Sequence, residues 1–139
     1  MQPSASPPAP SARIVVTNHD PGLMGLLQEL LTDEGYEALP PDPADPYPFI
    51  KEVRAALVIL DVVYREEAKA LTTLDKLKLD PDTTAIPVLV CTTTPGALEG
   101  VAARQREGDL TILTKPFDLE DLLAAIRARL AGAGHRGTR

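Results

Sequence analysis

Five short apolar runs alternate with stretches of helical periodicity along the centre of this chain, and this alternation restricts the possible folds more than any other feature. A strand buried on both faces of a sheet has such a continuous apolar sequence. The predicted strands are residues 14–17, 36–39, 56–60, 87–91 and 110–113. The predicted helices are residues 21–34, 47–53, 66–79, 95–107 and 119–130. Strands that alternate with helices predict an α/β fold with a doubly wound five-stranded parallel sheet in the order 2-1-3-4-5.

The first strand and helix carry the clearest local signals. Asp20 is expected to cap the helix, Pro21 to occupy its first position, and Gly35 to end it in the left-handed conformation. The apolar face of this helix consists of leucines at helical spacing, namely Leu23, Leu26, Leu27, Leu30 and Leu31. We expect this face to pack on the sheet.

The two ends of the chain differ from its centre. Residues 1–12 contain four prolines with serine and alanine, a composition that buries too little apolar surface to fold. Residues 132–139 are rich in glycine and arginine and are predicted to form a flexible tail. Residues 13–131 are therefore expected to form one domain, whose length suffices for a single hydrophobic core.

Charge and cysteine content exclude several classes of function. The chain has 20 Asp and Glu against 14 Lys and Arg, a net charge of −6 at pH 7, whereas nucleic-acid binding needs basic residues that neutralise phosphates. The single cysteine, Cys91, excludes a disulfide framework and a cysteine-based zinc site. The sequence contains no apolar run near the roughly 20 residues that span a membrane. We expect a cytoplasmic domain that binds neither nucleic acid nor membrane.

Three polar residues follow neighbouring strands of the predicted sheet. Asp61 follows the third strand, Thr92 the fourth and Lys115 the fifth, and ligands of doubly wound folds bind beyond the carboxyl ends of the strands. A carboxylate there can attack phosphorus and form an acyl phosphate, while a lysine and a hydroxyl stabilise the phosphoryl oxygens. Each residue alone has an ordinary explanation, as a turn residue, a helix cap or a solvated lysine. Their combination indicates phosphoryl chemistry.

Over nearly all of residues 13–131 the chain resembles the receiver domain of two-component response regulators. LVILD at 57–61 is similar to the phosphoacceptor strand of that family, and IPVLVCT at 86–92 to its fourth strand with the terminal Thr or Ser. LTKPFDLEDLL at 113–123 is similar to its Lys-Pro segment. The opening strand and helix, IVVTNHDPGLMGLLQELLTDEGYE, match as well. The resemblance implies the flavodoxin-like receiver fold.

The resemblance also assigns roles to individual residues. It implies that Asp61 is the phosphoacceptor, Thr92 the switch hydroxyl and Lys115 the partner of the phosphate. The backbone carbonyl of Val63 would be a metal ligand. The aromatic residue that the family carries in the fifth strand is replaced by Ile112, which argues against the usual aromatic-coupled form of the switch.

The family's acidic pair after the first strand is replaced by Asn18 and His19. Mg²⁺ prefers hard oxygen ligands, and imidazole is a poor substitute for a carboxylate. We therefore expect Mg²⁺ binding by Asp61 and the Val63 carbonyl to be weak or absent. His19 has three possible roles: it fills a degenerate pocket, it ligates a softer metal with Asp61, or it makes the pocket sensitive to pH near neutrality.

The sequence favours a non-enzymatic, receiver-like signalling module with weakened or lost phosphorylation, acting by protein–protein binding. Its partner would be a histidine kinase or another signalling protein, or a second copy of the chain through the face of the fourth helix, fifth strand and fifth helix. The alternative is a phospho-accepting response regulator with Asp61 phosphorylated by a histidine kinase.

Two other classes have a similar topology or a similar set of site residues. A haloacid-dehalogenase-type enzyme would carry its nucleophile on the first strand in an Asp-x-Asp motif, whereas Asp61 is on the third and the second position is Val63. A flavodoxin-like cofactor binder would need a Gly-rich, hydroxyl-rich loop after the first strand, where this chain has TNHDPG. The position of Asp61 argues against the first class, and the loop after the first strand argues against the second.

Overall fold

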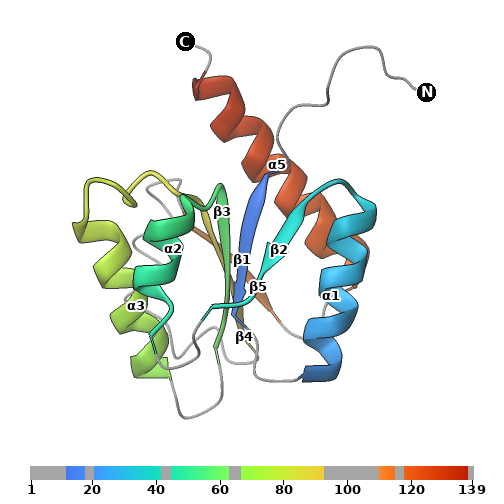
Figure 1. The fold of residues 1–139 in the computed structure, drawn as a ribbon, viewed down its shortest axis with the longest axis horizontal. Coiled ribbons are helices and arrows are strands. Elements are labelled where there is room, and N and C mark those ends of the chain that lie inside the picture. The colour runs from blue at the N-terminus through green and yellow to red at the C-terminus, as the bar shows by residue number, and fades with distance from the viewer. Residues whose placement is uncertain are drawn as a thin grey trace.

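The computed structural model describes residues 12–17, 21–41, 45–62, 67–92, 110–114 and 118–137. It has a five-stranded sheet in the order β2-β1-β3-β4-β5, all of whose neighbouring strands are parallel (Figure 1). The predicted α/β fold and its strand order are therefore confirmed. The strands are β1 (Arg13–Thr17), β2 (Glu37–Leu39), β3 (Leu57–Asp61), β4 (Val88–Thr92) and β5 (Leu110–Thr114).

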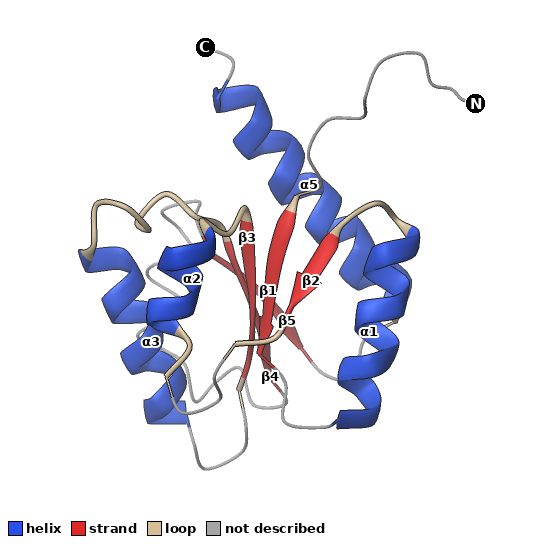
Figure 2. Cartoon of the chain, viewed as in Figure 1, coloured by secondary structure: helices blue, strands red, loops and turns tan. Residues whose placement is uncertain are grey.

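Helices cover both faces of the sheet. Among the described residues they are α1 (Pro21–Asp33), α2 (Tyr47–Val53), α3 (Glu67–Leu79) and α5 (Leu119–Gly137). Helices α2 and α3 lie on one face, and α1 and α5 lie on the other (Figure 2). The helix predicted over 95–107 lies outside the described residues, as does the N-terminal tail apart from residue 12.

Alternating side chains of each strand build one core on each face of the sheet. In β1, Val15 packs toward α2 and α3, while Ile14 and Val16 pack toward α1 and α5. In β3, Val58 and Leu60 lie in the first core and Leu57 and Ile59 in the second. This alternation arises because successive side chains of a strand point to opposite faces. It explains why the buried parts of β1, β3 and β4 are apolar at consecutive positions.

Helix α1 ends as the sequence predicts. Gly35 has φ +89°, in the left-handed region. Its amide donates to the carbonyl of Thr32 at 3.0 Å, and the amide of Tyr36 donates to the carbonyl of Leu31 at 2.9 Å. This is the Schellman pattern, which satisfies carbonyls that the last turn of a helix leaves unpaired.

Helix α5 is longer than predicted. Its helical backbone continues to Gly137, into the segment that we expected to be a flexible tail. Two alanines in this extension, Ala131 and Ala133, have the highest intrinsic helix propensity, which offsets part of the cost of the glycines between and after them.

No helix in the described parts of the chain has the length and apolar character needed to cross a membrane.

Candidate functional site

The carboxyl ends of the central strands form one edge of the sheet, where the sequence places the candidate site. Asp61 is the last residue of β3 and is half-buried, and Thr92 is the last residue of β4 and is 1% exposed. The register pairs Asp61 with Cys91 and Thr92 with Thr114. Because these strands are parallel and adjacent, the two predicted site residues lie at the same edge.

The main chain of Asp61 and its neighbour is fixed from both sides. The amide of Asp61 donates to Oγ1 of Thr17 on β1 at 2.9 Å. The next amide, that of Val62, donates to the carbonyl of Cys91 on β4 at 2.9 Å. Successive amides of a strand point to opposite neighbours, so the end of β3 is attached to both adjacent strands. Sequence reasoning did not find Thr17, since a threonine at a strand end is unremarkable.

The other candidate residues follow these strand ends. Asn18 and His19 come directly after β1, and Lys115 comes directly after β5, but these residues and Val63 lie outside the described residues. Their roles therefore stay predictions. Ile112 is in the middle of β5, half-buried against the core beneath α2 and α3.

The sequence after β1 differs from the donor set that Mg²⁺ prefers. The fold of the chain brings the end of β1 beside the end of β3, with Thr17 opposite Leu60. The residues that follow β1 are an amide and an imidazole rather than two carboxylates, whereas Mg²⁺ requires hard oxygen ligands in octahedral geometry. In the described parts of the chain, no three His, Cys, Asp or Glu side chains come together as a metal site.

The fold and the sequence of this chain are similar to those of known proteins. A signal receiver domain of a histidine kinase from Syntrophus aciditrophicus superposes with a TM-score of 0.71 at 25% identity, covering 88% of this chain and 92% of that domain. Protein PilH of Pseudomonas aeruginosa is 31% identical over 122 residues, which are 87% of this chain and 99% of PilH. The chain belongs to the response-regulator receiver family. No family model matches this receiver domain.

The chemotaxis protein CheY4 of Vibrio cholerae has the same fold as this receiver domain. Its TM-score is 0.67 at 21% identity, and the match covers 85% of this chain and 98% of CheY4. The strand order of the receiver domain and the position of Asp61 at the end of β3 fit this family. The edge formed by the ends of β1, β3, β4 and β5 is therefore the candidate functional site.

A second group of charged residues joins α2 to the connection between α3 and β4. Lys51 Nζ lies 2.9 Å from Asp80 Oδ2 and 3.6 Å from Asp82 Oδ2. The hydroxyl of Tyr47 donates to the Asp80 carboxylate, and so does the amide of Asp82, at 2.9 Å. The hydrogen bond from Tyr47, then that from Lys51, then that from the Asp82 amide lower the pKa of Asp80 to about 2. The Asp80 carboxylate in turn raises the pKa of Tyr47 and of Lys51.

No local pattern in the sequence indicates this cluster. The Asp80-Pro81 pair predicts only the end of a helix, and α3 does end at Leu79. The Asp80 carbonyl then accepts the amides of Thr83 and Thr84 at 3.0 and 2.8 Å. Tyr47 and Asp80 are 33 positions apart in the chain, so only the packing of α2 against α3 brings them together.

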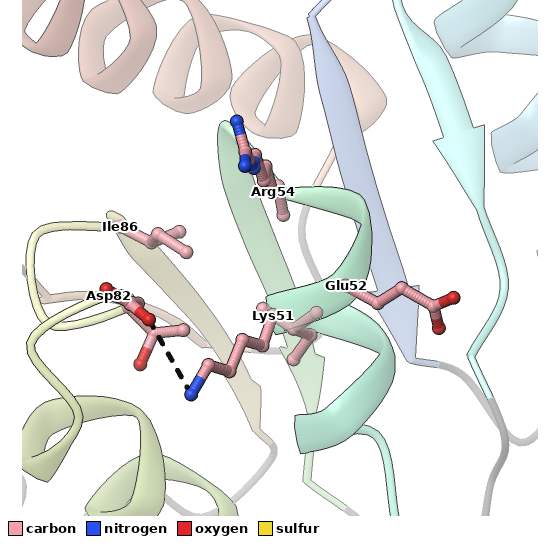
Figure 3. Close-up of a pocket in the computed structure, with 8 residues that line it drawn as sticks. Lys51, Glu52, Arg54, Asp82 and Ile86 are labelled. Atoms are coloured by element: carbon pink, nitrogen blue, oxygen red, sulfur yellow. Dashed lines mark ion pairs between the residues drawn. The ribbon is translucent and has the colours of Figure 1, made fainter.

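A cavity of about 510 Å³ lies beside this cluster (Figure 3). Its residues precede β3 and β4 in the chain, which places them at the amino ends of those strands. Ile50, Ala55 and Thr83 are buried, and Ile86 is half-buried. In Figure 3 the Lys51 side chain extends toward Asp82, with which it forms an ion pair. Neither Asp61 nor Thr92, which the resemblance assigns to the phosphoacceptor site, lines this cavity.

Proposed function

We propose that this receiver domain is a signalling module in which Mg²⁺-dependent phosphorylation of Asp61 is weakened or lost. The observation that carries the proposal is the pair Asn18–His19, which directly follows β1 where the family has two acids. Replacing both carboxylates removes hard oxygen ligands and most of the negative charge that attracts Mg²⁺. Phosphoryl transfer to an aspartate needs such a cation to neutralise the charge that develops on the phosphoryl oxygens.

We further propose that the module acts in the cytoplasm by binding a histidine kinase or another signalling protein. One candidate surface consists of the predicted fourth helix, β5 and α5, and it would also serve a second copy of the chain. Three residues of the edge strand β5 are half-buried, namely Thr111, Ile112 and Leu113. Part of the surface of this strand is therefore accessible to a partner. A charge reversal at the exposed Glu120 on α5 should then weaken association without loss of stability.

A second candidate is a working phospho-accepting regulator. The observation in its favour is that Asp61 and Thr92 are both present at adjacent strand ends. Asp61 is half-buried, so part of this residue is accessible to solvent. In this alternative a histidine kinase phosphorylates Asp61 despite the altered residues after β1.

Intact-mass spectrometry after incubation with phosphoramidate separates these two functions. The wild-type chain, Asp61→Asn and Asp33→Asn would each be measured with and without Mg²⁺. Asp33 is an exposed acid at the end of α1, and its variant controls for unspecific labelling. The proposal predicts little or no adduct on any chain. A Mg²⁺-dependent adduct that is present in Asp33→Asn and absent in Asp61→Asn would establish the alternative.

A further inference from the structure

We propose that Thr17 is a positioning residue for Asp61. Its hydroxyl attaches the main chain of Asp61 to β1 and so fixes the direction in which the carboxylate leaves the end of β3. The inference rests on the proposed function in one respect only, namely that Asp61 is the functional residue of the site. It concerns a residue outside the family's motif positions that the sequence alone did not single out.

Two hydrogen bonds carry the inference. Thr17 Oγ1 accepts the amide of Asp61 at 2.9 Å and donates to the carbonyl of Ile59 at 3.3 Å. The amide of Asp61 and the carbonyl of Ile59 flank Leu60, which is the register partner of Thr17. In a parallel ladder, one residue of the neighbouring strand bonds to both such groups through its own amide and carbonyl. A hydroxyl is both donor and acceptor, so the Thr17 side chain supplies one further rung of the ladder.

The chemistry of threonine explains why this rung forms where the strand ends. Thr17 is the last residue of β1 and pairs in register with Leu60, so the Asp61 amide lies one position beyond the last register pair of these two strands. A valine has the same shape but no hydroxyl, and it would leave the Asp61 amide without this partner on β1. Threonine is also stiff at χ1, which favours a fixed position for Oγ1. The hydroxyl therefore attaches β1 to β3 one position beyond their last register pair, at the amide of Asp61.

The hydrogen bond between the Asp61 amide and Thr17 matters more in a site that lacks the acidic pair after β1. In a receiver with an acidic pair, a bound cation can hold the phosphoacceptor carboxylate in place. Here Asn18 and His19 follow Thr17 directly, so the protein has to orient Asp61 by its own hydrogen bonds. Thr17 on one side and the Val62–Cys91 hydrogen bond on the other achieve this for the main chain. The Cα–Cβ bond of Asp61 then leaves the end of β3 in one direction, with or without a metal or phosphoryl group.

NMR spectroscopy of Thr17→Val, Thr17→Ser and Thr83→Val tests the inference. Thr83 is the matched control because it is 1% exposed and its hydroxyl donates to a main-chain oxygen, that of Leu77, at 2.6 Å. The readouts are the hydrogen-exchange rate of the Asp61 amide and the ¹³C chemical shift of its carboxyl group at constant pH. Neither readout requires phosphorylation, so the result is independent of whether the proposed function holds.

We expect Thr17→Val to accelerate exchange of the Asp61 amide about five- to tenfold, the factor that corresponds to one hydrogen bond. Its carboxyl resonance should shift as well. Thr17→Ser retains the hydroxyl, so both readouts should have their wild-type values. Thr83→Val should change neither the carboxyl shift nor the exchange rate of the Asp61 amide, once exchange through global unfolding is subtracted. Unchanged values in Thr17→Val, equal changes in Thr17→Val and Thr83→Val, or a serine variant that behaves like valine would each overturn the inference.

Discussion

Replacing Arg54 with glycine should stabilise the receiver domain. Arg54 follows α2 with φ 54° and ψ 58°, in the left-handed region, and it is the one non-glycine residue with positive φ in the described part of the chain. Its amide donates to the Lys51 carbonyl at 3.2 Å, and the Ala55 amide donates to the Ile50 carbonyl at 3.3 Å. Helix α1 ends with the same pair of hydrogen bonds, but with Gly35 in the left-handed position.

The size of the effect follows from two opposing costs. The left-handed conformation costs an L-residue roughly 1–2 kcal/mol because Cβ approaches the following carbonyl oxygen. Glycine costs about 0.4–1 kcal/mol through the greater freedom of the unfolded chain. The Arg54 side chain is exposed and makes no hydrogen bond or ion pair with another described residue, so little else is lost. We expect Arg54→Gly to raise the free energy of unfolding by about 0.5–1 kcal/mol.

Urea and thermal unfolding of wild type, Arg54→Gly and Arg54→Ala would measure this effect. The alanine variant removes the side chain and keeps the left-handed cost, so its free energy of unfolding should stay within about 0.5 kcal/mol of wild type. For a domain of this size, the glycine variant should unfold roughly 2–5 °C higher. A glycine variant no more stable than the alanine variant would refute the argument from backbone conformation.

Three further predictions address the site, the charged cluster and the core. The double variant Asn18→Asp and His19→Asp should bind Mg²⁺ more tightly in calorimetric titration, and an unchanged affinity would mean that the alignment of the first strand is wrong. Because the pKa of Asp80 is lowered to about 2, its contribution to stability is present above the ordinary value of 3.8 and is lost as the pH falls toward 2. Tyr47→Phe removes the largest cause of this shift, so an NMR titration should show a higher pKa for Asp80, and an unaltered pKa would exclude the hydrogen bond. Leu77→Ala, at a fully buried position of α3, should lower the free energy of unfolding by about 3–5 kcal/mol in urea, and a loss below about 1 kcal/mol would contradict its place in the core.

The identity of the elements was accessible from the sequence because their signals are local. Buried strands such as β3 are apolar up to their last residue, and α1 has a leucine face and is followed by Gly35 in the left-handed conformation. These features depend on residues within about one helical turn or a few strand positions of each other. The same local reading predicted Asp61 and Thr92 at strand ends, where the structure places them. The roles of Lys115, Asn18 and His19 stay predictions.

The details of α2 and of the end of α5 were less predictable. Glycine is the usual signal for a left-handed helix end, and Arg54 gives no such signal. In α5, the glycines after residue 131 predicted a tail, yet the helix continues to Gly137. In both cases the sequence signal is a statistical preference of about 1 kcal/mol, which the rest of the fold can outweigh.

The sequence by itself therefore determined the α/β class, the strand order and the strand ends at which the candidate site lies. Only the tertiary structure decided which distant groups meet. Tyr47 contacts Asp80 across 33 positions, and Thr17 contacts Asp61 across 44. A hydroxyl at a strand end can form hydrogen bonds with many groups. Which group it contacts depends on the register between β1 and β3 and on the packing of the helices. Local periodicity carries no information about such contacts, because hydrogen bonds between distant residues form only once the whole sheet is assembled.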